Sequence, residues 1–180
     1  MNLLKLKEIP KIISDEYQGK RVVFMSGAFD LFHYGHFHAL YTASQLGDIF
    51  VLQIDGNRLV KNRKGKERPF MDEKERAQII TSLKFVNFAF ISNTPSEDIR
   101  TLQMINPDVF VRAKLHTETN LDRKIREKTI LTKMTRGRIV WLEQTPEIST
   151  TKIVSALIKP NDFHFNPRKN LSMKSTSLAN

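Results

Sequence analysis

The sequence predicts a single α/β domain in which a parallel five-stranded sheet carries helices on both faces. Two observations predict it: five short, densely apolar runs recur along the chain, and segments with helical spacing of apolar residues separate them. Each run is too short for a helix, and a continuous apolar run is typical of a strand that is buried on both faces. Strands that alternate with helices favour a parallel sheet covered on both sides. A chain of 180 residues has room for one well-packed domain.

The expected elements follow in order along the chain. A leading helix is expected at about 2–17, with an interruption near Pro10, and the main domain occupies 19–158. The strands are expected at about 22–25, 49–54, 85–91, 109–111 and 139–142, and the other helices at about 36–46, 73–84, 96–105, 119–135 and 149–158. Residues 159–180 turn polar and lose periodicity, which predicts a flexible basic tail.

The composition excludes several classes of protein. No apolar run approaches the roughly 18–20 residues that span a bilayer, so we expect no membrane protein. The first residues carry lysines where a signal peptide is apolar, and cysteine is absent. We therefore expect a cytoplasmic protein without disulfides, thiolate zinc sites or thiol nucleophiles. The 29 Lys and Arg against 19 Asp and Glu give a net charge of +10, which attracts anions such as nucleic acid, acidic membranes or phosphorylated small molecules.

The segment after the first strand carries the clearest chemistry. Three of the five histidines, His33, His36 and His38, fall within six residues at the start of a predicted helix. Parallel α/β sheets bind ligands beyond the carboxyl ends of their strands, where helix N-termini face outward. Gly27 lets a ligand approach the backbone, and two imidazoles beside a helix start would offer donors to phosphate oxygens. Two other interpretations stay open: one histidine packs while the others are solvated, or the three bind a metal together with Asp30, although the H-E-x-x-H spacing is absent.

Two further segments point to an anionic ligand. Residues 58–69 hold six cations and one acid in what we expect to be a loop beyond the second strand, at the same sheet edge as the histidines. Such a run is usually only a solvated face, but its position here favours a phosphate clamp. Ser149, Thr150 and Thr151 follow the fifth strand. A single hydroxyl there would be an ordinary helix cap, whereas the three together offer hydroxyls and amides at a second helix start.

Two common nucleotide-binding motifs are absent. No G-x-G-x-x-G follows the first strand, and no G-x-x-x-x-G-K-[ST] occurs anywhere. The sequence therefore argues against a dinucleotide-dependent dehydrogenase and against a P-loop NTPase.

Taken in this order, the three segments resemble the H-x-G-H nucleotidyltransferase superfamily, whose members are described as cytidylyltransferase-like. Its signature corresponds to His33-Tyr34-Gly35-His36. The resemblance covers about residues 17–158. It is closest to the adenylyltransferase domain that makes ADP-heptose, and next to glycerol-3-phosphate cytidylyltransferase. The signature is weak alone, but it stands in register with Gly27-Ala28-Phe29-Asp30 before it and Ser149-Thr150-Thr151 near the end. Other matching residues are Lys64, Gly65, Arg68, Pro69, Arg76, Thr94, Pro95, Asn106, Pro107 and Asp108.

The resemblance implies a Rossmann-like fold and a transferase reaction. An NMP group would pass from an NTP, either ATP or CTP, to a phosphorylated sugar or polyol, and pyrophosphate would leave. His33, His36 and Lys64 would be catalytic. The nucleotide would be bound by Gly27, Ala28, Phe29, Asp30, Arg68, Arg112, Ser149, Thr150 and Thr151. Mg²⁺ would enter with the NTP and need few protein ligands, with Asp30 as the nearby carboxylate. The family also leads us to expect a homodimer.

Two departures from the family pattern keep other functions open. Where heptose-type members usually have Lys-Gly-Gly-Asp-Tyr, residues 112–116 are Arg-Ala-Lys-Leu-His, so Arg112 keeps the cation while the glycines and the acid are gone. Gln144 stands near the place of an arginine in the cytidylyltransferases. A second interpretation is therefore a nucleotide-binding or regulatory module with reduced catalysis. A basic nucleic-acid-binding protein ranks last, because no recognition signature for DNA or RNA occurs.

Overall fold

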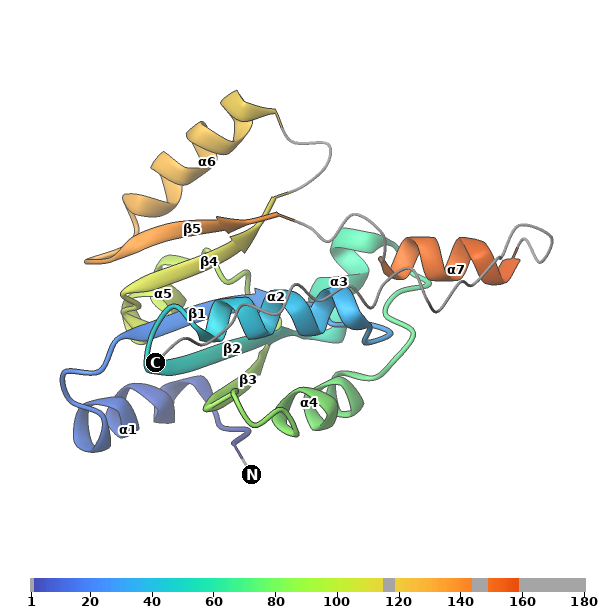
Figure 1. The fold of residues 1–180 in the computed structure, drawn as a ribbon. Coiled ribbons are helices and arrows are strands. Elements are labelled where there is room, and N and C mark those ends of the chain that lie inside the picture. The colour runs from blue at the N-terminus through green and yellow to red at the C-terminus, as the bar shows by residue number, and fades with distance from the viewer. Residues whose placement is uncertain (1, 115–118, 144–148, 159–180) are drawn as a thin grey trace, which may run out of the picture.

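The computed structural model describes residues 2–114, 119–143 and 149–158 (Figure 1). The strands are β1 (Val22–Gly27), β2 (Ile49–Asp55), β3 (Phe88–Ser92), β4 (Val109–Ala113) and β5 (Arg138–Leu142). The helices are the 3₁₀ turn η1 (Leu6–Glu8), α1 (Ile9–Glu16), α2 (Tyr34–Ser44), α3 (Asn57–Lys64), α4 (Glu73–Thr81), α5 (Ile99–Ile105), α6 (Asn120–Leu131) and α7 (Thr150–Ile158). Within these ranges, every helix is too short or too polar to span a bilayer.

The five strands form one sheet in the order β3-β2-β1-β4-β5, and each neighbouring pair is parallel. β1 lies at the centre, where Phe24 pairs with Val51 of β2 and with Phe110 of β4. The strand order reverses between β1 and β4, and open α/β sheets bind their ligands in the crevice at such a reversal. The predicted parallel, Rossmann-like sheet is confirmed.

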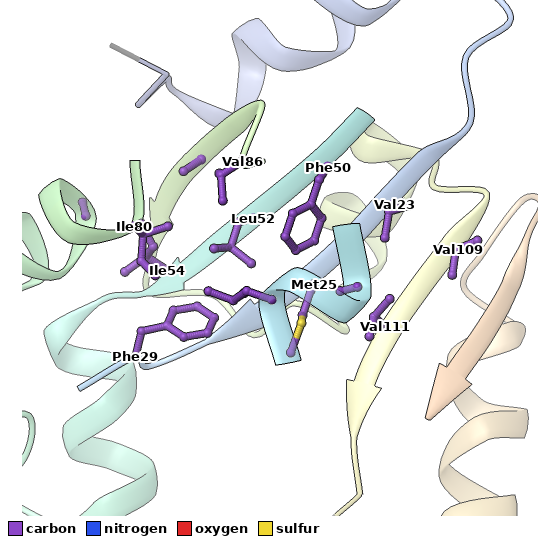
Figure 2. Close-up of a cluster of buried hydrophobic side chains, with 14 residues drawn as sticks. Val23, Met25, Phe29, Phe50, Leu52, Ile54, Ile80, Val86, Val109 and Val111 are labelled. Carbon is purple, nitrogen blue, oxygen red and sulfur yellow. The ribbon is translucent and has the colours of Figure 1, made fainter. Parts of the chain in front are cut away.

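Helices α2 and α4 cover one face of the sheet. Figure 2 shows the cluster there, in which Met25 of β1 and Leu52 of β2 project from neighbouring strands. Leu40 of α2 and Ile80 of α4 are fully buried against them. Burying one such side chain stabilises the fold by about 1.5–3 kcal/mol, so this contact fixes the position of α2 on the sheet.

The opposite face carries α1, α5 and α6. Phe24 points to this side because successive side chains of a strand alternate between faces. Its ring stacks on Phe110 and on Phe90, with centroid distances of 5.2 Å and 6.2 Å. Ile9 of α1 and Ile130 of α6 are buried in the same cluster. The helices on both faces agree with the prediction, and they leave the carboxyl edge of the sheet open to α3 and α7 (Figure 1).

The segment expected to be a loop beyond β2 is helical over its first half. It forms α3, in which Leu59 and Val60 are buried although cations surround them in the sequence. Two side chains from elsewhere cap its start: Glu73 accepts the Asn57 N–H at 2.6 Å, and Asn93 accepts the Leu59 N–H at 3.1 Å. The first N–H groups of any helix have no acceptor within the helix. Here the acceptors come from other elements, and the local sequence could not reveal them.

Smaller differences concern where elements begin. The leading helix is shorter than the expected 2–17: α1 begins at Ile9, and Pro10 lies in its first turn, where a missing N–H costs nothing. Leu3, expected in this helix, instead forms a parallel bridge with Ala89 of β3. β3 starts at Phe88, later than expected, and the Asn87 side chain before it accepts the Phe50 N–H at 2.8 Å. The residues proposed as a flexible tail, 159–180, lie outside the described residues.

Candidate active site

The loop between β1 and α2 brings the backbone and the histidines to the carboxyl edge of the sheet. A Cβ at Gly27 would lie 2.8 Å from the Phe29 ring, so glycine is needed for this close approach. Phe29 and Leu31 have φ angles of +51° and +49°. Non-glycine residues adopt this left-handed region at a cost of about 1–2 kcal/mol each, so the surrounding structure must hold the loop in place.

A fully buried arginine on α4 supplies part of that support. Arg76 donates to the carbonyl oxygen of Ala28 and, at 2.8 Å, to that of Asp55 at the end of β2. It also donates to the Met71 carbonyl at 3.1 Å and to the Asn57 side-chain oxygen at 2.9 Å. One guanidinium thus joins the loop after β1, the end of β2 and the starts of α3 and α4.

His33 and His36 stack on each other at the start of α2. Their ring centroids lie 3.8 Å apart at an interplanar angle of 21°, and the edge of the Phe29 ring meets His36. Burial, together with the charges of His33 and Lys64, lowers the pKa of His36 to about 3. Burial and Lys64 also lower the pKa of His33. Both rings are therefore neutral at neutral pH, and each Nδ1 is buried without a hydrogen-bond partner.

Asp30 ties three distant segments together. Its carboxylate accepts the N–H groups of Phe70 and Met71 at 3.0 Å each and pairs with Arg68 at 2.9 Å. Its backbone oxygen accepts the Thr150 hydroxyl at 2.9 Å. The Asp30 side chain is fully buried by these partners and does not line the cavity described below. The expected contact of its carboxylate with the nucleotide and its magnesium ion stays a prediction, which this inward packing does not support.

Lys64 and Arg68 reach the histidines from the end of α3 and the turn after it. Gly65 ends the helix with a φ of +99°, which turns the chain back toward the loop after β1. Burial, followed by the charge of Arg68, lowers the pKa of Lys64. Arg68 also lies 4.6 Å over the Phe70 ring, a second contact that orients its guanidinium.

The start of α7 completes the site. Thr150 is buried by its bond to Asp30, while the Ser149 hydroxyl accepts the Lys152 N–H at 3.2 Å as a helix cap. Ser149, Thr150 and Thr151 all face the same cavity. The hydroxyls and open amides of this helix start are thus held within reach of a ligand at the histidines.

These groups line one cavity of about 820 Å³ at the carboxyl ends of the strands. The sequence-predicted residues that line it are Gly27, Ala28, Phe29, His33, His36, Lys64, Arg68, Arg112, Ser149, Thr150 and Thr151. His38 also touches the cavity, but its ring lies beside Tyr34 and not in the histidine stack. Among the described residues, no three His, Cys, Asp or Glu side chains converge as metal ligands, so the three-histidine metal site finds no support there.

Sequence reasoning missed three charged residues of the cavity wall, Asp55, Arg126 and Glu143. A fourth, Arg63, belongs to the cation segment 58–69 but was not singled out within it. Asp55 ends β2 and pairs with Arg63 at 3.1 Å, and burial raises its pKa. Its place at a strand end could have identified it by the rule that selected the histidines. Arg126 belongs to α6, a charged helix for which no sequence pattern indicates a place at the site.

The departure after β4 changes the wall only in part. Ala113 lines the cavity, whereas the Lys114 ammonium pairs with Glu143, and its N–H donates to the Leu142 carbonyl at 2.9 Å. The added positive charge is therefore neutralised beside the cavity. His116 and Gln144 lie outside the described residues.

A model of the family described as cytidylyltransferase-like matches residues 24–156, which span β1 to α7 and every group placed in the cavity. The chain belongs to the cytidylyltransferase-like family. This confirms the resemblance to H-x-G-H nucleotidyltransferases that was drawn from the sequence. Among curated proteins, the chain is similar to the bifunctional protein HldE of Syntrophotalea carbinolica, with 34% identity over 144 residues. It is also similar to HldE of Geobacter sulfurreducens, with 33% identity over 150 residues.

These alignments cover 78% and 82% of this chain but only 28% and 29% of the relatives, so the chain matches under a third of their length. A lipopolysaccharide core biosynthesis protein of Thermoplasma volcanium shares the fold, with a TM-score of 0.58 and 24% identity over 70% of this chain and 98% of its own. Pantoate-beta-alanine ligase of Francisella tularensis, solved with beta-gamma ATP and beta-alanine, also has a TM-score of 0.58, with 13% identity over 87% of this chain and 76% of its own. These two likenesses concern the fold.

Proposed function

We propose that the protein is a nucleotidyltransferase that joins the NMP group of ATP or CTP to a phosphorylated sugar or polyol and releases pyrophosphate. One observation carries the proposal: two neutral stacked histidines, two cations and a hydroxyl-rich helix start, from three distant parts of the chain, line one cavity. The family membership supports the same reaction class.

The cavity suits a reaction that needs charge neutralisation more than a base. An oxygen of the acceptor phosphate is already an anionic nucleophile; it attacks the α-phosphorus, the bond from that phosphorus to the bridging oxygen breaks, and that oxygen leaves with pyrophosphate. The barrier falls mainly through positioning and through donors to the charge that builds on the phosphates. His33 and His36 would donate from neutral rings, while Lys64 and Arg68 would supply positive charge.

Magnesium fits this cavity as a companion of the triphosphate. Such an ion usually keeps several waters and takes only one or two carboxylates from the protein. Two carboxylates of the described residues line the cavity, Asp55 and Glu143. Glu143 is exposed and pairs with Lys114, so we assign to Asp55, at the end of β2, the contact that the sequence suggested for Asp30. When bound, the ion would neutralise phosphate charge during transfer.

The test is pyrophosphate release. The purified chain is incubated with Mg²⁺, each of ATP and CTP, and a panel of sugar phosphates and polyol phosphates, and a coupled assay follows pyrophosphate. We expect release with one NTP and one class of acceptor, which would also decide between adenylyl and cytidylyl transfer. Tight NTP binding without release from any pair would instead favour the regulatory module.

A further inference from the structure

A single glutamate joins two arginines in the wall of the cavity. Glu97 lies just before α5, Arg112 on β4 and Arg126 on α6. The Oε1 atom of Glu97 lies 2.5 Å from Nη2 of Arg112, 3.2 Å from Nε of Arg126 and 3.1 Å from Nη2 of Arg126. Both arginines line the cavity, whereas Glu97 does not. The carboxylate thus stands behind them.

The contacts of Arg112 show how fully its side chain is fixed. Besides Glu97, its Nη1 atom donates to the Ser96 hydroxyl at 3.1 Å and reaches the Ser26 hydroxyl at 3.4 Å. The guanidinium lies 5.4 Å over the Phe110 ring. Its Nε is buried without a partner. A free arginine side chain has many rotamers, and these contacts restrict them before a ligand arrives.

Glu97 also offsets the electrostatic repulsion between the two closely placed arginines. Two guanidinium groups that share one oxygen repel each other, and the Arg126 charge contributes to the lowered pKa of Arg112, which burial brings to about 10. Without the carboxylate, the two side chains would move apart. Burial opposes the charge on Glu97, yet the two arginines hold its pKa below the ordinary value.

We propose that Glu97 is a positioning residue that holds Arg112 and Arg126 together in the cavity wall, so that Arg112 is ordered for the anionic nucleotide. This inference rests on the proposed function, because it takes the cavity to be the nucleotide site. It adds α6 and the segment before α5 to the elements that build that site.

The chain contains a reporter for this arrangement. Trp141 on β5 is the one tryptophan in the sequence. The Arg126 guanidinium lies 5.5 Å from its ring centre, and its indole N–H donates to Glu127 at 3.0 Å. A shift of Arg126 changes the charge beside the indole, so tryptophan fluorescence reports the position of Arg126 without any turnover.

The experiment compares Glu97→Gln with the wild type and with Glu16→Gln, which removes the same charge from the exposed end of α1. Binding of Mg·ATP and Mg·CTP is measured by calorimetry, and kcat and KM by pyrophosphate release. Loss of a charged hydrogen bond is worth roughly a tenfold change or more. We expect Glu97→Gln to bind the accepted nucleotide about tenfold more weakly, to raise KM more than it lowers kcat, and to change the Trp141 emission. Glu97→Asp should restore part of the affinity, and Glu16→Gln should match the wild type.

The direction of the change in nucleotide affinity distinguishes a positioning role of Glu97 from a purely electrostatic effect of its charge. Removing a negative charge near the cavity should by itself tighten the binding of an anion. Unchanged or tighter nucleotide binding by a folded Glu97→Gln protein, or an unchanged Trp141 emission, would overturn the inference. If Glu97→Gln does not fold, Arg126→Lys keeps the charge but loses the forked contact, and it should reproduce the weaker binding and the altered emission. Absence of pyrophosphate release from the wild type would contradict only the proposed function, since binding and fluorescence need no reaction.

Discussion

His36 shows how a single side chain can be prepared for phosphate chemistry by burial. With a pKa of about 3 its ring stays neutral, and its stacking on His33 fixes the plane in which its N–H can point. A neutral donor adds no charge of its own, so in the proposed function the attraction of the triphosphate depends on Lys64, Arg68 and Arg112. Geometry and charge are thus supplied by different residues.

Replacing His36 by Ala should lower kcat by about 100- to 1000-fold, the usual loss for one transition-state donor in a preorganised site. His38→Ala is the matched control: its ring is exposed beside Tyr34, and we expect activity within about threefold of the wild type. Initial rates of pyrophosphate release measure both. Equal losses in the two variants would contradict the assignment and revive a site that uses all three histidines.

The low pKa of His36 also predicts how stability depends on pH. In the unfolded chain the imidazole takes up a proton near pH 6.5, whereas in the folded chain it resists until about pH 3. Protons therefore favour the unfolded state between these values, and stability falls as the pH drops below about 6.5. From pH 7 to pH 5, this one group should cost about 2 kcal/mol.

Urea unfolding at the two pH values measures that loss. His36→Asn cannot take up this proton, so its free energy of unfolding should fall about 2 kcal/mol less than that of the wild type between pH 7 and pH 5. Equal losses of the free energy of unfolding in the two proteins would show that the pKa of His36 is not lowered in the folded chain.

At the scale of elements, the site depends on how α3 and α7 are attached to the loop after β1. Asp30 makes both attachments, to the turn after α3 through its carboxylate and to α7 through its backbone oxygen. The carboxylate is fully buried and paired, so its removal leaves Arg68 and two amides without their partner. The turn after α3 would then lose its anchor, while the bond from Thr150 of α7 to the Asp30 backbone oxygen would remain.

Asp30→Asn should lower the free energy of unfolding by about 3 kcal/mol, the order expected when one partner of a buried ion pair is lost. Asp15→Asn breaks the exposed pair with Lys11 on α1, which is 2.6 Å long, and should leave the stability close to that of the wild type. Chemical denaturation compares the two. A loss for Asp30→Asn as small as that for Asp15→Asn would mean that the turn after α3 stays attached without this carboxylate.

The elements that could be predicted from the sequence are those whose burial follows from a local pattern of apolar residues. Continuous apolar runs such as 22–25 and 49–54 mark strands that are covered on both faces, and the structure places them side by side at the centre of the sheet. The helical half of 58–69 escaped prediction because its two buried side chains, Leu59 and Val60, stand among cations. Its caps come from Glu73 and Asn93.

The same limit explains which site residues were found. The histidines and the 149–151 hydroxyls follow strands directly, so strand ends identified them. Asp30 also follows a strand, but its partners at positions 68–71 turn its carboxylate inward, and no local pattern reveals that choice. Arg126 lies in the cavity wall, where its partner Glu97 comes from another element, and no local pattern shows such a contact.

In the molecule as a whole, the apolar clusters that stabilise the fold and the candidate site lie on different parts of the sheet. The two apolar clusters lie on its faces, while the cavity occupies the carboxyl edge beside α3 and α7 (Figure 1). The net charge of +10 belongs to the whole chain, so we expect it to add a general attraction for anions to the contacts proposed at this edge.

That attraction should be sensitive to salt. Raising the ionic strength from about 50 mM to about 500 mM shortens the range of the field to a few ångström, so KM for the nucleotide should rise several-fold while kcat changes little. Steady-state rates over a series of KCl concentrations measure the effect. A KM that stays constant over this series would show that the nucleotide is held by short-range contacts alone.

The bond between Thr150 and Asp30 joins positions that are 120 residues apart. During translation, all five strands leave the ribosome before Thr150 does, so the nascent chain can pair its sheet while the phosphate-binding wall is still incomplete. Of the described elements, α7 is therefore the last to join the cavity wall. A chain that stops after β5 would lack the Thr150 bond to Asp30 and the hydroxyls that the proposed nucleotide site takes from α7.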